Sequence, residues 1–349
     1  MKESGFVRAS QAVLSRRSIL AGAVALPLAA CVSQAQANSQ AMAQGGTQAS
    51  SSSTAELILL GTQGGPNYGP SRSETANALR VGENLFLIDC GYGTLASMVA
   101  AGLHHQDVDA IFLTHLHDDH SSDLFAILTH MATQSRNRDV VIYGPTGTQA
   151  YVNGLRAALT PNAKIRILDE ARPPGFLDFI KAVEVTDGDV PVQQNGVRIS
   201  CAQNTHYPAS IDGLETQGSL AFRFDWGDSI VFSGDTTYSE NLVALARGAD
   251  VFVCEVLEPV AMRRAFDAMV AGGAFAGAEE GVWRHMVDTH ASPTQVGQMA
   301  AEAGVERVVL THLAPGALLD VPDSTYVAGV AERFSGPIIV AEDGMVVPL

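Results

Sequence analysis

Lysine is almost missing from this sequence of 349 residues, which contains only Lys2, Lys164 and Lys181. Lysine and arginine together number 21, against 37 aspartates and glutamates, so the formal net charge is −16. Proteins that bind nucleic acid usually display a basic patch or stripe that neutralises phosphates. The composition therefore predicts a small-molecule substrate and no nucleic acid partner.

Cysteine is scarce as well. Beyond Cys31 the chain has Cys90, Cys201 and Cys254, each within an apolar run such as "LFLIDCG". An odd number of cysteines at irregular spacing is not typical of a disulfide framework, so we expect three small, buried side chains. Charged residues are also few, at 17% against 46% hydrophobic residues. This composition provides a large core and is not that of a disordered chain.

Residues 1–37 have the pattern of an export signal. The pair Arg16 and Arg17 precedes an apolar run and a cluster of small residues, which is too short and wrongly flanked for a membrane-spanning helix. "SRRSIL" resembles a twin-arginine signal, and "LAAC" resembles a lipobox that would make Cys31 the lipid-bearing first residue. Cleavage after Ala37 is the alternative and would release a soluble protein. We therefore expect a periplasmic protein whose membrane contact would be a lipid at Cys31.

A single folded region follows the signal. The Gln/Ser/Ala-rich run over 38–54 predicts a flexible tether. From residue 55 to 349, runs typical of buried strands, such as "ELILLGT" and "DAIFLTH", alternate with helical patterns such as "SSDLFAILTHMATQ" and "SPTQVGQMAAEAGV". Strands and helices mixed through one continuous region predict one α/β domain over 55–349, built of layered sheets covered by helices.

The stretch "THLHDDHSSD", residues 114–123, concentrates ligand-type side chains. His115 and His117 are two apart at the end of a predicted strand, so an extended backbone points both side chains the same way. Asp119 and His120 follow where the chain turns into a helix. Imidazole and carboxylate groups are the ligands of zinc and similar divalent ions. The stretch therefore predicts part of a metal site.

Three further predicted strands each end in one ligand-type residue. His206 in "NTHYP" follows "VRISCAQ", Asp235 in "FSGDT" follows "SIVF", and His312 in "LTHLAP" follows "RVVL". Loops at strand ends on a rigid sheet are common places for functional sites. We expect these residues to join the stretch at 114–123 in one metal centre.

This order, H-x-H-x-D-H followed by His, Asp and His, resembles the metallo-β-lactamase superfamily. The resemblance covers the chain from about residue 56 onward and implies a four-layer αββα sandwich with a two-metal site between its central sheets. It also implies which ligands serve each ion: His115, His117 and His206 for one, Asp119, His120 and His312 for the other, and Asp235 bridging both. The domain over 55–349 would then be a hydrolase domain.

Two divalent cations are the cofactors that the resemblance implies, and zinc is the first expectation. Imidazole and carboxylate ligation without a thiolate also suits manganese or iron. In such a site the two ions share a hydroxide that acts as the nucleophile, and Asp119 would orient or deprotonate its parent water.

Two other stretches resemble the ribonuclease Z and arylsulfatase branch of the superfamily. One is "LGTQGGPNYGPSRSETANALRV", residues 60–81, and the other is "DTHASPTQVGQMAAEAGVERVVLTHLAP". The resemblance implies that His290 assists transition-state charge or leaving-group protonation and that Glu255 in "VCEV" is its partner carboxylate. The zinc β-lactamases have cysteine or no ligand in the place of Asp235, which argues against antibiotic hydrolysis.

The predicted function is that of an exported dinuclear hydrolase of small sulfate or phosphate esters. Processing of tRNA is set aside, because "HAS" and "THLAP" differ from ribonuclease Z and no basic arm is present. The alternatives are a lactonase or β-lactamase-type ring hydrolase and a non-catalytic metal-binding surface module. The sequence is compatible with a monomer or a homodimer. His104, His105, His130 and His285 are interpreted as ordinary surface or packing residues.

Overall fold

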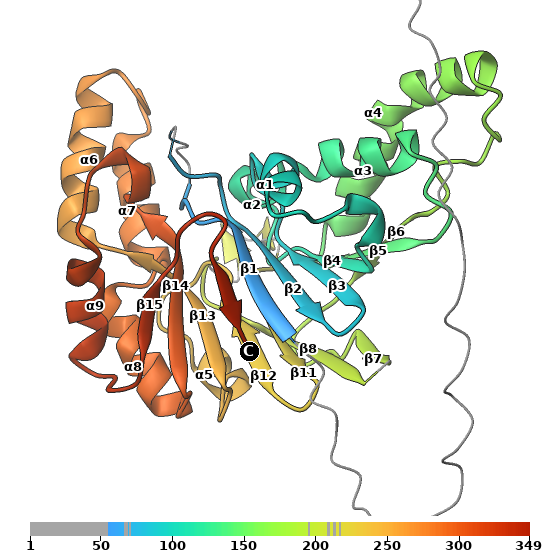
Figure 1. The fold of residues 1–349 in the computed structure, drawn as a ribbon. Coiled ribbons are helices and arrows are strands. Elements are labelled where there is room, and N and C mark those ends of the chain that lie inside the picture. Colours follow the sequence, from blue (N-terminus) through green and yellow to red (C-terminus); the bar gives the residue numbers. More distant parts are fainter. Residues whose placement is uncertain are drawn as a thin grey trace, which may run out of the picture. The chain divides into compact units, whose positions relative to one another are not determined.

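The computed structural model describes residues 55–65, 69, 71–194, 196–207, 210–211, 214–215 and 218–349. The predicted signal at 1–37 and tether at 38–54 lie outside the described residues. The part of the chain from residue 55 is built on two seven-stranded sheets that lie face to face (Figure 1).

The first sheet has the strand order β16-β1-β2-β3-β4-β5-β6. Its strands are β1 (Ala55–Gly61), β2 (Ala76–Val81), β3 (Asn84–Ile88), β4 (Ala110–Phe112), β5 (Val140–Gly144), β6 (Ile180–Glu184) and β16 (Val346–Pro348). β1, β2 and β3 are antiparallel neighbours, whereas β3 to β6 run parallel. β16 pairs with β1, so the two ends of the described chain meet in this sheet.

The second sheet has the strand order β15-β14-β13-β12-β11-β8-β7. Its strands are β7 (Val192–Gln194), β8 (Val197–Gln203), β11 (Leu220–Asp225), β12 (Ser229–Phe232), β13 (Val251–Leu257), β14 (Arg307–Ala314) and β15 (Ile338–Val340). β12, β13, β14 and β15 run parallel, so their carboxyl ends lie along one edge. A separate short pair is formed by β9 (Ser210–Ile211) and β10 (Leu214–Glu215).

The main core lies between the two sheets and is rich in phenylalanine. Phe86 and Phe112 of the first sheet and Phe222 and Phe224 of the second are buried there. The rings of Phe112 and Phe222 meet edge to face with centroids 5.3 Å apart, a preferred aromatic geometry. These contacts hold the sheets together, because alternate residues of each strand point to the same face.

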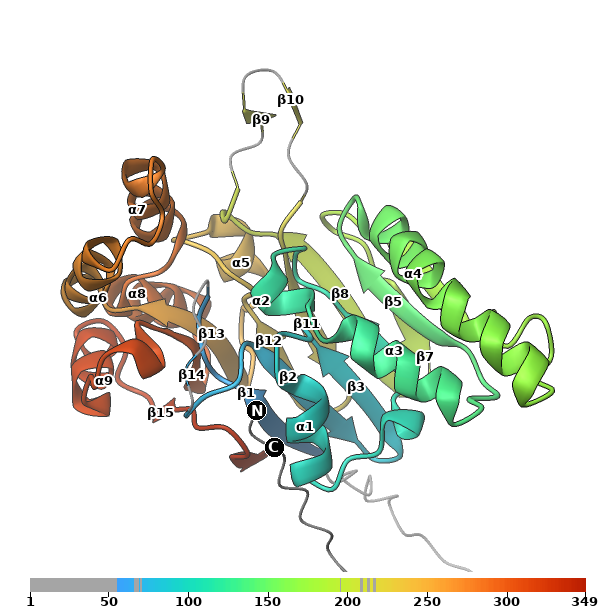
Figure 2. The same cartoon turned by 90° about the horizontal axis from the view of Figure 1, so that it is seen from above.

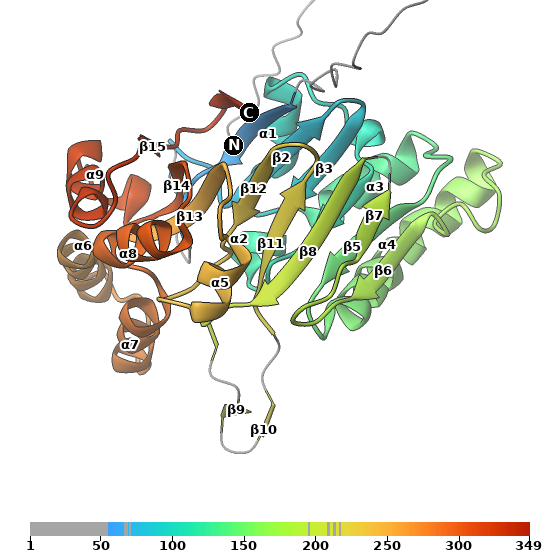
Figure 3. The same ribbon diagram turned by 90° about the horizontal axis from the view of Figure 1, so that it is seen from below.

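Helices cover the outer face of each sheet, as Figures 2 and 3 show from above and below. On the first sheet lie α1 (Thr94–Ala100), α3 (Leu124–Thr133) and α4 (Thr148–Asp169). On the second lie α5 (Glu240–Leu245), α8 (Pro293–Ala303) and α9 (Asp323–Ala331). The remaining α-helices of the described residues are α2 (Asp118–Ser121), α6 (Pro259–Ala271) and α7 (Glu279–Thr289). The prediction of a four-layer αββα sandwich is confirmed.

Local details agree with the sequence in most places. Cys90, Cys201 and Cys254 are buried free thiols, as expected.

α6 and α7 pack on each other through apolar side chains, with Phe266 and Trp283 ring centroids 5.3 Å apart. None of the helices among the described residues is long and apolar enough to cross a bilayer.

Candidate metal centre

The stretch after β4 supplies the largest share of the site. β4 ends at Phe112, and His117 takes the capping position before α2 with an extended backbone. His115 is fully buried, and its Nε2 lies 3.1 Å from Nδ1 of His117. The chain then turns into α2, which carries Asp119 and His120, both buried. The predicted clustering of these four side chains is therefore present in the structure.

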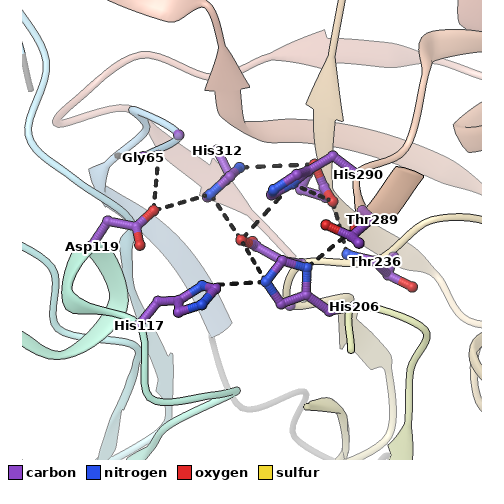
Figure 4. A network of polar contacts seen from close by, with 12 residues as sticks. Gly65, His117, Asp119, His206, Thr236, Thr289, His290 and His312 are labelled. Carbon is purple, nitrogen blue, oxygen red and sulfur yellow. Dashed lines mark hydrogen bonds and ion pairs between the residues drawn. The ribbon is translucent and has the colours of Figure 1, made fainter. Parts of the chain in front are cut away.

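One group of ligand-type atoms comes from three places in the chain. The group combines one ring nitrogen or carboxylate oxygen each of His115, His117, His206 and Asp235, all within 4.8 Å of one another. His206 follows β8, and its Nε2 lies 3.3 Å from Nδ1 of His117 (Figure 4). Asp235 follows β12, and its Oδ2 lies 3.7 Å from Nε2 of His115. This is the set predicted for the first ion together with the bridging carboxylate.

A second group shares Asp235 with the first. It combines one such atom each of Asp119, His120, Asp235 and His312, again all within 4.8 Å. His312 Nε2 lies 3.4 Å from Asp119 Oδ2 and 3.2 Å from Asp235 Oδ2. The other oxygen of Asp235 lies 3.2 Å from His120 Nε2. Asp235 therefore faces both groups, as a bridging ligand must.

His312 reaches the site by a route that the sequence did not predict. It was expected to follow a strand that ends at Leu310, but it lies inside β14, which continues to Ala314. Pairing with β13 shifts at this point, so His312 has no opposite residue, and its φ of 45° is left-handed. Such bulges are common beside active sites, because they redirect one side chain from an otherwise regular strand.

Charges within the centre are strongly coupled. Burial by itself would lower the pKa of His312, but the carboxylates of Asp235 and Asp119 outweigh it and raise that pKa to about 10. Burial likewise acts against the charged form of Asp235, yet His120 and His312 hold its pKa well below the usual range. For His115 burial prevails and lowers the pKa. A divalent cation would replace the protons of the raised histidines as the partner of these carboxylates.

Asp89 supports the site and was not identified from the sequence. It follows β3, is buried, and its Oδ2 accepts a hydrogen bond from Nδ1 of His120 at 2.9 Å. Its carboxylate also accepts from the backbone N–H and the hydroxyl of Thr114. This contact fixes the His120 ring so that Nε2 faces the centre, a common arrangement behind metal-bound histidines. Its only sequence signal is an aspartate at the end of an apolar run.

The glycine-rich turn after β1 closes against Asp119. The backbone N–H of Gly65 donates to Asp119 Oδ2 at 2.8 Å. A Cβ placed on Gly65 would lie 2.1 Å from the same oxygen, so any larger residue would displace the carboxylate. The resemblance pointed to this turn without indicating its contact.

His290 and Glu255 form the predicted pair beside the two groups. His290, labelled in Figure 4, follows α7, and its Nδ1 lies 3.0 and 3.1 Å from the two oxygens of Glu255. Glu255 lies in β13 and also accepts from the backbone N–H of Thr236 and of Ala291. Burial would lower the pKa of His290, but Glu255 and Asp235 outweigh it and raise the value. Glu255 thus fixes the orientation of the ring.

His285, interpreted from the sequence as ordinary, also lies at the centre. Its ring centroid is 5.1 Å from that of His206 and 5.6 Å from that of His117. Burial, followed by the charges of His290 and His117, lowers its pKa to about 4. No sequence pattern pointed to this position, because His285 lies within the helix α7 rather than at a strand end.

The side chains present fit two divalent cations. His120 Nε2, Asp235 Oδ1 and His312 Nδ1 are buried and make no hydrogen bond among the described residues; their nearest charged neighbours are ion-pair contacts, 3.2 Å between His120 Nε2 and Asp235 Oδ1 and 3.8 Å between His312 Nδ1 and Glu255. Leaving such atoms buried without partners is costly unless something else binds them. Imidazole and carboxylate donors in two groups with one shared carboxylate match the preferences of zinc and related ions.

Known proteins resemble this chain in sequence and in fold. Residues 84–313 match the family model of the beta-lactamase superfamily domain. The ribonuclease Z of Mycobacterium avium (strain 104) is 32% identical over 295 residues, which cover 82% of this chain and 96% of that protein. The metallo-beta-lactamase fold protein YhfI from Bacillus subtilis has a TM-score of 0.61 at 17% identity and covers 85% of this chain and 100% of its own. The short form of human tRNase Z has a TM-score of 0.56 at 20% identity, over 84% of this chain and 98% of its own.

These relatives contradict one prediction. The composition pointed to a small-molecule ester and excluded nucleic acid, yet a protein similar over nearly its whole length is named a ribonuclease. The exclusion was wrong because net charge is summed over the whole chain and does not describe the potential at one site. Divalent cations are often the largest local charges in such a site.

Proposed function

Because this chain belongs to the metallo-β-lactamase superfamily, we propose that it hydrolyses phosphodiester bonds and that its substrate is RNA. Its membership makes it a metal-dependent hydrolase. The observation that supports the proposal is that Asp235 is shared by two groups of ligand-type side chains, with the His290–Glu255 pair beside them. The substrate class is supported by the similarity to a ribonuclease Z.

The seven ligand-type side chains would hold the cations, and each is oriented by the fold. When bound, two divalent cations lower the pKa of a water that becomes the nucleophile and neutralise charge on the phosphoryl oxygens. Asp89 orients His120, and the backbone carbonyl of Thr289 lies 3.2 Å from Nδ1 of His206. Asp119, whose Oδ2 accepts a hydrogen bond from the Gly65 N–H, would orient the attacking water.

The leaving group requires a proton. Hydrolysis joins the oxygen of water to phosphorus and breaks the P–O bond to one ribose, whose oxygen leaves as an alcohol after protonation. Nδ1 of His290 faces Glu255, so Nε2 is the ring nitrogen that makes no hydrogen bond within the described part of the chain. We assign proton donation to Nε2 of His290 and assign Glu255 as the positioning residue that holds the ring. General acid catalysis of this kind contributes about 10²- to 10⁴-fold.

The first experiment compares substrates on the metal-loaded and the chelated protein. The substrates are a labelled RNA hairpin with a single-stranded 3′ extension, bis-p-nitrophenyl phosphate, p-nitrophenyl sulfate, a lactone and a chromogenic cephalosporin. We expect cleavage of the RNA and of the phosphodiester, lost on chelation and restored by zinc or manganese. The Asp235→Ala variant controls for contaminating nucleases. Turnover confined to the sulfate, the lactone or the cephalosporin would refute the proposal.

We also propose that residues 1–37 direct export by the twin-arginine route, that 38–54 is a tether, and that Cys31 carries a lipid. The support is the sequence pattern alone, "SRRSIL" followed by "LAAC". Fractionation of bacteria that express the full chain tests the proposal. We expect the protein in the periplasmic membrane fraction, loss of export when Arg16 and Arg17 are both changed to lysine, and release from the membrane in Cys31→Ser. Periplasmic protein that is not bound to membrane in the unaltered chain would instead indicate cleavage after Ala37.

A further inference from the structure

His285 borders the proposed RNA site without belonging to either ligand group that includes Asp235. A ring nitrogen of His285 lies within 4.8 Å of a ring nitrogen of both His206 and His290. Its ring also lies beside that of His117, with centroids 5.6 Å apart. The residue is half-buried, so the protein does not enclose it completely.

The hydrogen bonds of Thr289 determine which nitrogen of His285 carries a proton. The Thr289 hydroxyl donates to the backbone carbonyl of His285 at 2.7 Å and also lies 3.2 Å from Nδ1 of the same residue. A hydroxyl has one proton, so towards Nδ1 it acts as the acceptor and Nδ1 is the protonated nitrogen. Nε2 is then the bare nitrogen of the neutral ring, with no partner among the described residues.

Because Nε2 of His285 carries no proton, it can only accept a hydrogen bond, so its partner in the substrate must be a donor. The non-bridging oxygens of a phosphodiester accept hydrogen bonds and offer none, so Nε2 gains nothing from them. Close to the phosphorus of an RNA chain, the ribose 2′-hydroxyl is a donor, and DNA lacks it.

We propose that Nε2 of His285 accepts a hydrogen bond from the ribose 2′-hydroxyl next to the scissile phosphate, and so favours RNA over DNA. This inference rests on the proposed function. It assigns to His285 the recognition of the sugar, separate from metal binding and from protonation of the leaving group.

The test uses three oligonucleotides of one sequence with the metal-loaded enzyme. One is RNA, and each of the other two carries a single 2′-deoxyribose, one on each side of the mapped cleavage bond. For the unaltered protein we expect kcat/KM to fall about tenfold with the deoxyribose on one side, in the range of one hydrogen bond. In His285→Ala we expect the RNA to react about tenfold more slowly and the difference between the RNA and the deoxyribose substrates to disappear.

Three further measurements distinguish the loss of a hydrogen bond to the substrate from a purely structural effect of the substitution. His285→Gln keeps an acceptor and should recover part of the preference for ribose. His130→Ala, an exposed histidine of α3, should leave the preference unchanged. Metal analysis of His285→Ala should find two ions, and loss of one would make His285 a ligand and refute the inference.

The outcomes separate this inference from the function on which it rests. Cleavage of RNA with no dependence on the 2′-hydroxyl, or a preference that persists in His285→Ala, overturns the role of His285 and leaves the phosphodiesterase in place. Absence of cleavage of both RNA and bis-p-nitrophenyl phosphate by the unaltered protein overturns both.

Discussion

Two regions of this protein each contain a cluster of histidines. The distances between the rings are similar in the two clusters, but the surrounding charges differ. His104, His105 and His130 lie together away from the metal centre, His104 and His130 exposed and His105 buried, with His104 and His105 ring centroids 4.6 Å apart. In the metal centre, His115 and His117 are 4.7 Å apart. Among the described residues, the four sets of ligand-type side chains close enough to share an ion all lie in or beside the metal centre.

The difference lies in the carboxylates. Burial and the neighbouring histidines His104 and His130 lower the pKa of His105. In the centre burial would lower the pKa of His312, but Asp235 and Asp119 outweigh it and raise the value to about 10, because their buried negative charges favour a positive partner. Close imidazoles alone therefore do not make a metal site. The requirement is buried carboxylates among the imidazoles.

Removing the carboxylate of Asp235, which both ligand groups share, should have the largest effect of the substitutions considered. In Asp235→Ala both ligand groups lose a member, so we expect loss of at least one ion and a fall in kcat/KM of about 10³-fold or more. Metal content by mass spectrometry and RNA cleavage check this result. His130→Ala should keep both values. Two retained ions with full activity in Asp235→Ala would refute the assignment of Asp235 as the bridge.

Substitution of His290 tests whether a histidine of the buried centre can act as a proton donor without being a metal ligand. In His290→Ala we expect both ions to remain and kcat to fall about 10²- to 10⁴-fold, because the proton donor is lost. Glu255→Gln should give a smaller loss, since the ring remains but is less well held. Loss of metal from His290→Ala would show that His290 is a ligand instead.

Substitution of Asp89 tests the contribution of a carboxylate that orients a metal ligand, His120, without belonging to either ligand group. Asp89→Ala frees the His120 ring, so we expect metal affinity or activity to fall about 10- to 100-fold. Asp89→Asn keeps an acceptor and should lose less. Competition with a chromophoric chelator measures the affinity, and an unchanged value in the alanine variant would contradict this role.

The histidine group around His105, away from the metal centre, provides the smallest expected effect, a dependence of stability on pH. The folded protein holds the pKa of His105 below its usual 6.5, first through burial, so below that pH the unfolded chain binds the proton more readily. The contribution of His105 is therefore complete above about pH 6.5 and is lost progressively as the pH falls from that value through the lower pKa of the folded protein. Urea unfolding of the protein and of His105→Gln at pH 7.5 and 5.5 isolates it. An equal pH dependence in both proteins would show that His105 contributes nothing.

The fold was predictable because its signals are local. Short apolar runs ended by glycine and helices with polar caps, such as Ser292 before α8, report the conformation of their own segment. The layered α/β arrangement follows from their alternation. The sheet order was not predictable, since β16 pairs with β1 across almost the whole described chain.

For the site, the sequence by itself determined the types of ligand and their order, because the ability of imidazole and carboxylate groups to bind metal ions is a property of the side chains themselves. Only the tertiary structure decided which of them meet. It placed Asp89 behind His120 and His285 beside His206, contacts between elements far apart in the chain. It also redirected His312 through a bulge that depends on pairing with β13. Such contacts arise from the packing of whole sheets and helices, which no local pattern encodes.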